Sequence, residues 1–137
     1  MNNINDLCKL QPTDLDAGQV FSGKPSGTTV RGYAVHSAYT PAIDHEYIFH
    51  ESSRDVVVWF LNAQEPLYIF GPTGCGKTTC IKQLAARLNY PVFEVTGHGR
   101  LEFADLVGHL TVKNGSMTFE YGPLALAMRY GAIILLN

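Results

Sequence analysis

The stretch from Gly71 to Thr78, GPTGCGKT, constrains this chain more than any other part of its sequence. It satisfies the pattern of a phosphate-binding loop, G-x-x-x-x-G-K-[ST], at every fixed position. Glycines let the backbone adopt positive φ angles and approach an anion closely, so consecutive N–H groups can converge on phosphate oxygens. The loop therefore predicts a mononucleotide site.

The residues on either side of the loop have the order that such a site requires. Pro66–Phe70 is a short apolar run, typical of a buried parallel strand. Beyond the loop, an apolar helical stripe begins near Lys77 and consists of Ile81, Leu84, Ala85 and Leu88. We therefore expect a strand, the phosphate-binding loop and a helix, in that order. A glycine turn that merely joined a strand to a helix would need neither Lys77 nor Thr78.

Each polar group of the loop has an expected role. Lys77 places a mobile positive charge on the β and γ phosphates and is the candidate catalytic residue, while Thr78 offers a hydroxyl to Mg²⁺. The helix N-terminus adds its partial positive charge. The predicted phosphate-binding residues are Gly71, Pro72, Thr73, Gly74, Cys75, Gly76, Lys77, Thr78 and Thr79.

Length and composition set the class of protein. A chain of 137 residues has room for at most one domain. Its hydrophobic fraction of 46% and net charge of −2 exclude a disordered chain and one that coats nucleic acid. The longest apolar runs, Val56–Leu61 and Gly131–Leu136, are too short to span a bilayer, and the N-terminus lacks a signal-peptide core. We expect a cytoplasmic protein without a membrane partner.

Two groups of side chains suggest other chemistry. His45, Glu46, His50 and Glu51 could suggest a metal site, but a spacing of five residues turns like residues away from each other on a helix, which favours polar surface. The cysteines are three, an odd number without C-x-x-C spacing, so a disulfide framework is not expected. Cys75 occupies a variable loop position; the alternative is a redox-sensitive thiol.

The remaining elements follow from local patterns. Residues 1–39 show little periodicity and predict an extended arm, with one edge strand at Thr29–His36. A largely buried helix is expected from Arg54 to Asn62, capped by Ser52 or Ser53. Pro91 should stop the loop helix ahead of a second parallel strand at Val92–Val95, and a short helix or turn should end at Gly108.

A β-hairpin from Leu110 to Phe119 is predicted around Asn114-Gly115, the preferred pair for a two-residue type I′ turn. This turn sets Leu110 opposite Phe119, and it places four apolar side chains on one face, with Thr111 and Thr118 on the other. After the hairpin we expect a helix that starts at Pro123 and ends just before Gly131, with Leu124, Ala127 and Met128 on one face, and then a buried strand over Ala132–Leu136.

Several stretches together carry a resemblance to a known family. Ile133–Leu136 lies about 55 residues after the loop, where ATPases with this loop have an apolar strand followed by Asp and Glu. The other stretches are Thr40–Phe49, Arg100 with Asp105–Gly108, and Tyr121–Leu124 before Ala127. On these residues the chain from about Val20 resembles AAA+ ATPases of the MoxR and cobaltochelatase small-subunit type.

The resemblance implies an α/β P-loop NTPase fold, a three-layer sandwich with a parallel sheet that is incomplete in this chain and carries an inserted hairpin. It implies an N-terminal arm at 1–39 and the N-terminal part of an AAA+ ATPase domain at 40–137. It also implies ATP and Mg²⁺ as cofactors, a hexameric ring that hydrolyses ATP between subunits, and work on a partner protein, by remodelling or by metal insertion. Nothing points to nucleic acid.

One departure from the family pattern concerns Asn137, which stands at the position of the metal-associated Asp. An Asn can accept a hydrogen bond from a metal-bound water, so Asn137 is a second Mg²⁺ candidate beside Thr78. Because the catalytic Glu would follow Asn137, we expect a fragment that binds the phosphates without turnover. The alternatives are a nucleotide-binding assembly or sensor module and a small P-loop kinase or GTPase, although the hairpin and arm disfavour the latter.

Overall fold

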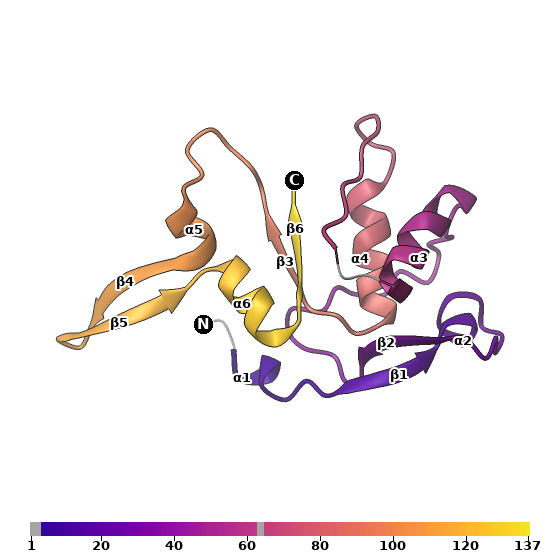
Figure 1. Ribbon diagram of the computed structural model, residues 1–137, viewed down its shortest axis with the longest axis horizontal. Coiled ribbons are helices and arrows are strands. Elements are labelled where there is room, and N and C mark those ends of the chain that lie inside the picture. Colours follow the sequence, from indigo (N-terminus) through magenta and orange to yellow (C-terminus); the bar gives the residue numbers. More distant parts are fainter. Residues whose placement is uncertain (1–3, 63–64) are drawn as a thin grey trace. The chain divides into compact units, whose positions relative to one another are not determined.

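The computed structural model describes residues 4–62 and 65–137, and its chain divides into two compact units, Met1–Pro91 and Val92–Asn137. Figure 1 labels their helices and strands. Among the described helices, none combines the length and the apolar character that crossing a membrane would take. The first unit holds the glycine-rich loop, and the second holds a parallel strand pair and the hairpin.

The first unit begins with α1 (Ile4–Leu7) and an antiparallel pair, β1 (Pro12–Asp16) with β2 (Thr29–Tyr33). Helix α2 (Ala17–Ser22) lies within their connection, as Figure 1 shows at the indigo end of the chain. Asp16 organises this connection: its carboxylate accepts from the N–H of Gln19 at 2.8 Å and from that of Gly27 at 2.7 Å. These backbone donors lower the pKa of Asp16.

The extended arm expected for residues 1–39 is therefore wrong over most of its described length. The edge strand expected at Thr29–His36 is confirmed but ends at Tyr33. Its partner β1 went unpredicted because the register joins residues far apart, such as Pro12 with Tyr33, and no local pattern marks such a pairing. Residues 1–3 lie outside the described part of the chain, and the domain boundary at 39/40 stays a prediction.

The core of the first unit forms around the β1–β2 pair. Ala17, Val30 and Leu88 are buried there, with Leu15, Val20, Phe21, Phe60 and Tyr90 packed against them. Phe60 comes from α3 (Arg54–Asn62), which follows a 3₁₀ turn at Glu51–Ser53. The ring of His50 caps that turn by accepting from the N–H of Ser52, and the two serines expected to cap α3, Ser52 and Ser53, lie within the turn itself.

Helix α3 has the predicted bounds but is less buried than predicted. Val56, Val57, Trp59 and Phe60 are half-buried and Val58 is 45% exposed. The side chain of Leu61 lies outside the described residues. The exposure has a plain cause: apolar side chains occupy consecutive positions here, so they surround the helix axis and a single packed face cannot cover them all.

Helix α4 (Lys77–Arg87) confirms the prediction made from the loop and its stripe. Ile81, Leu84, Ala85 and Leu88 are all buried. The helix ends as Asn89 takes a positive φ of 59°, two residues before Pro91. The strand expected at Pro66–Phe70 is wrong: no described strand pairs with these residues, and Tyr68 and Phe70 are more than 80% exposed. A strand requires a paired neighbour as well as an apolar sequence.

The second unit contains β3 (Val92–Val95) paired in parallel with β6 (Ile133–Leu136). Helix α6 (Pro123–Tyr130) contacts both strands and ends at Gly131, whose φ is 64°. The buried residues of α6 are Leu126 and Ala127. Met128, which was expected on one face with Leu124 and Ala127, is 78% exposed, so the packed face of the helix includes Leu126 in its place. Strand β6 is half-buried instead of buried.

The hairpin consists of β4 (Gly108–Lys113) and β5 (Ser116–Tyr121), next to α5 (Phe103–Val107). Its predicted register is confirmed, with Leu110 opposite Phe119 and Thr111 opposite Thr118. Asn114 and Gly115 have the positive φ angles that a type I′ turn needs. The four apolar side chains of one face are between 44% and 75% exposed: Leu110, Val112, Met117 and Phe119.

Candidate functional site

The glycine-rich loop has the backbone geometry that phosphate binding requires. Gly74 and Gly76 take φ angles of 82° and 84°, a region that side-chain-bearing residues rarely adopt. Gly76 is also the N-cap of α4, and no side chain caps the helix there. Because the first N–H groups of a helix lack intrahelical acceptors, this end of α4 offers donors and a partial positive charge to an anion.

Lys77 folds back across this loop. Its ammonium donates to the carbonyl oxygens of Gly71 at 2.9 Å and Pro72 at 2.7 Å, and it lies 3.7 Å from the Cys75 sulfur. Most of the predicted phosphate-binding residues are exposed, while Gly76, Lys77 and Thr78 are half-buried. A mobile ammonium beside converging N–H groups fits the charge and donor requirements of nucleotide phosphates.

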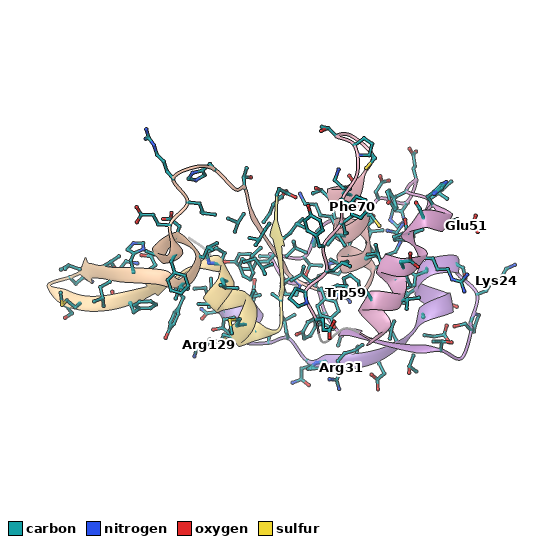
Figure 2. The ribbon with its side chains drawn as sticks, turned by 45° about the horizontal axis from the view of Figure 1, so that its top comes forward. Lys24, Arg31, Glu51, Trp59, Phe70 and Arg129 are labelled. Carbon is teal, nitrogen blue, oxygen red and sulfur yellow. The ribbon has the colours of Figure 1, made fainter. Side chains whose placement is uncertain are left out.

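The segment that leads into the loop is held by α3. The indole Nε1 of Trp59 donates to the carbonyl of Glu65 at 2.8 Å. Figure 2 labels Trp59 on its helix and Phe70 directly before the loop. The rings of Tyr68 and Phe70 stack with their centroids 6.5 Å apart, as expected for alternate residues of an extended chain.

Asn137 belongs to the second unit, where its position is fixed by β3. Its N–H donates to the carbonyl of Val95 at 3.0 Å, and its own carbonyl accepts from Gly97 at 2.6 Å. Its side-chain Nδ2 donates to Oε1 of Glu94 at 2.6 Å. Glu94 was not predicted as a site residue, although two parallel strands ending together would have brought the two side chains to one edge.

A second group of interacting residues, which was not predicted from the sequence, lies on the C-terminal half of α4. Gln83 is buried, and its side-chain oxygen accepts from the N–H of Asp44 at 2.9 Å and from Arg87 at 2.7 Å. Arg87 donates to the carbonyl of Asp44 and lies 4.9 Å from the ring centroid of Phe49. These contacts attach residues 42–49 to the loop helix. The available signal was a pair of polar residues four apart, Gln83 and Arg87, beside the apolar stripe of this helix.

Burial is the main influence on the pKa of Tyr47, which lies in this region. Burial raises the pKa of Tyr47, and the nearby Cys80 thiol raises it further, while Arg87 acts in the opposite direction. Cys80 is buried, whereas Cys8 and Cys75 are exposed.

The four polar residues between positions 45 and 51, two histidines and two glutamates, lie on the surface. His45, Glu46, His50 and Glu51 are exposed. Across the part of the chain that the structure describes, no three His, Cys, Asp or Glu side chains come together in a way that could hold a metal ion.

Comparison with known families decides the class. Residues 66–137 match the model of the AAA domain (dynein-related subfamily), which is more than half of the chain. The chain belongs to the AAA domain family. The expected fold class, an α/β P-loop NTPase of AAA+ type, is thereby confirmed, and this AAA chain has the parallel strand pair of that class.

Curated relatives of this AAA chain agree with that membership. It is 44% identical over 72 residues to Protein NorQ of Paracoccus denitrificans, covering 53% of this chain and 27% of the relative. It is 43% identical over 99 residues to the denitrification regulatory protein NirQ of Stutzerimonas stutzeri, covering 72% and 33%. Identity to the aerobic cobaltochelatase subunit CobS of a Sinorhizobium species is 30% over 118 residues, covering 85% and 35%.

These relatives confirm the resemblance to the MoxR and cobaltochelatase type that the sequence motifs indicated. The matches to them cover about a third of each relative's own length.

Proposed function

We propose that this chain is an ATP-binding AAA+ module which, in the full-length protein, hydrolyses ATP with Mg²⁺ to remodel a partner protein or to drive metal chelation. The observation that carries the proposal is the glycine loop on α4, with Lys77 folded across it, in a chain of the AAA family. Regulatory and chelatase names among the relatives support work on a partner. We place the protein in the cytoplasm, in a homo-oligomeric, hexameric ring.

The loop residues have separate roles in this proposal. The ammonium of Lys77 pairs with the β and γ phosphates, and the N–H groups of residues 71–79 surround them. Thr78 would offer its hydroxyl to Mg²⁺, and Asn137 stays the second candidate, as an acceptor for a metal-bound water. Bound Mg²⁺ supplies charge neutralisation at the phosphates.

A second candidate function is a nucleotide-binding assembly or sensor module that does not turn ATP over. Asn137 favours it, because an amide at the acidic position is a weaker partner for a metal-bound water than a carboxylate. The AAA family match speaks against the third reading, a small P-loop kinase or GTPase.

Titration calorimetry of the full-length protein with ATP and Mg²⁺ tests the site. Lys77→Ala should weaken ATP binding about tenfold to a hundredfold, because it removes a charged hydrogen-bond donor from the phosphates. Lys24→Ala removes the same charge from an exposed loop of the same unit and should bind as wild type does. Equal affinities for the two variants would refute the site.

Steady-state phosphate release separates the two candidate functions. Turnover that disappears in Lys77→Ala supports the ATPase. Binding that depends on Lys77, in a protein that releases no phosphate with or without its partner, supports the assembly or sensor module.

A further inference from the structure

The turn of the β4–β5 hairpin carries an asparagine whose chemistry the proposed nucleotide site does not use. Asn114 and Gly115 are both exposed, with φ angles of 53° and 77°. In Figure 1 this turn lies at the end of the ribbon that points away from α5 and α6. A Cβ built on Gly115 would meet no atom within 4 Å. The backbone of Gly115 therefore has open space beside it.

The backbone nitrogen of Gly115 lies outside the hydrogen-bond ladder of the hairpin, which closes at the Lys113–Ser116 pair. Within the part of the chain that the structure describes, neither the Gly115 N–H nor the Asn114 side chain makes a hydrogen bond. The backbone nitrogen that follows an asparagine can close a five-membered ring on the side-chain carbonyl carbon. Here that nitrogen has neither an acceptor to hold it nor a side chain of its own to shield it.

Asn89 has a similar backbone conformation in the opposite environment. Its φ is 59°. Its Nδ2 donates to the carbonyl of Tyr33 at 2.8 Å, and the nitrogen of the next residue, Tyr90, donates to the carbonyl of Ala85 at 2.8 Å. Both groups that ring closure would use are therefore held by the fold at Asn89, so the chain contains its own comparison for Asn114.

We propose that Asn114 is a site of spontaneous modification, at which the side-chain amide is lost as ammonia and the hairpin is loosened. The Gly115 nitrogen attacks Cγ of Asn114, so that an N–Cγ bond forms and the Cγ–Nδ2 bond breaks. Nδ2 leaves as ammonia and takes the proton of the Gly115 nitrogen. Water then opens the cyclic imide at one of its two carbonyl carbons, which yields either an aspartate or an isoaspartate. No oxidant or reductant takes part.

Both products change the hairpin, and the isoaspartate changes it more. Each adds a negative charge next to Lys113, whose Nζ lies 3.3 Å from Oε2 of Glu120. In isoaspartate the main chain runs through Cγ and is longer by one CH₂ group. A type I′ turn joins its strands through two residues of fixed length, so the added group disrupts the Lys113–Ser116 register. Because an isolated two-stranded ribbon is only marginally stable, the hairpin then opens more often.

Ageing of the full-length protein tests the site. The protein is incubated from mildly acidic to mildly alkaline pH, and peptide mapping by mass spectrometry follows the replacement of the side-chain NH₂ by OH. Asn114 should react at least about tenfold faster than Asn89, whose two hydrogen bonds must open first. The rate at Asn114 should rise with pH, because the attacking nitrogen must lose its proton.

Asn114→Gly is the matched variant, since Gly-Gly also suits a type I′ turn but carries no amide. Limited chymotrypsin digestion measures the hairpin. Cleavage after Phe119 should be at least about threefold faster in aged than in fresh wild type, because cleavage follows local opening. Aged and fresh Asn114→Gly protein should be cleaved alike. Cleavage after Phe70, an exposed residue of the other unit, should not change with age in either protein.

Each part of the proposal can fail separately. Loss of the amide at Asn114 that is no faster than at Asn89 would overturn the site. A modified Asn114 in a hairpin that is cleaved at the fresh rate would overturn its effect on the hairpin, and so would equal acceleration in aged wild type and aged Asn114→Gly protein. None of these measurements uses a nucleotide, so their outcome is independent of the proposed function.

Discussion

Gln83 shows how one polar side chain can fix a segment without regular structure. It is only 7% exposed, and it bonds the N–H of Asp44 and the carbonyl of Ala42 from within α4. Gln83→Leu keeps the size of the side chain but leaves these backbone groups without their partner. We expect a loss of about 1–3 kcal/mol in the free energy of unfolding, measured by chemical denaturation.

The matched control for this substitution is Gln19→Leu, on the exposed surface of α2, which should change the free energy of unfolding by less than about 0.5 kcal/mol. Equal losses in the two variants would show that Gln83 contributes nothing through its buried hydrogen bonds.

Which single residues could be predicted depended on how far away their partners lie. Gly74, Gly76 and Lys77 belong to one short motif, so their spacing alone located the loop. Gln83 bonds a residue 39 positions away, and Glu94 bonds one 43 positions away. Contacts of this range arise from the folded backbone, and a single sequence contains no local pattern for them.

Among the elements, the hairpin depends on a glycine at its base. Gly108 has a φ of 123°, and a Cβ there would overlap the carbonyl oxygen of Glu120 and lie 2.9 Å from the nitrogen of Gly122. Gly108→Ala should therefore cost at least about 2 kcal/mol in the free energy of unfolding, through strain and overlap together.

Gly99→Ala is the comparison for this change, because a Cβ at that position meets no atom within 4 Å and the φ is not positive. It should alter unfolding by less than about 0.5 kcal/mol. If both alanines are tolerated equally in urea denaturation, the backbone at Gly108 is not the constraint described.

Elements whose hydrogen bonds form between residues close in sequence could likewise be predicted, whereas elements that need a distant partner could not. The β4–β5 hairpin was predicted to the register because its turn residues and its alternation lie within twelve residues or so. Pro66–Phe70 has an equally apolar sequence, yet no described strand pairs with it. Helices α4 and α6 supply their own backbone hydrogen bonds, and their bounds could be read from caps and periodicity.

At the scale of the whole molecule, the proposed ring gives the apolar face of the hairpin a function. Phe119 and its three apolar neighbours are exposed, and covering them between subunits would remove this surface from water. In the full-length protein, Phe119→Asp should weaken ring assembly at least about tenfold, because it would bury an unpaired charge, while ATP affinity stays unchanged.

Analytical ultracentrifugation with nucleotide measures this assembly. Thr118→Asp places the same charge on the other face of the hairpin and should leave the ring intact. A Phe119→Asp protein that assembles as the Thr118→Asp protein does would show that this face does not lie between subunits.

The contacts of Lys77 bear on what a measured nucleotide affinity means. Its ammonium already donates to two carbonyl oxygens of its own loop, from Gly71 and Pro72. A phosphate that takes this ammonium displaces those carbonyls, so the loop acts as an internal competitor for its own cation. Nucleotide binding then replaces the two carbonyl contacts of Lys77 by phosphate contacts, so the measured affinity reflects the difference in free energy between the two sets of contacts.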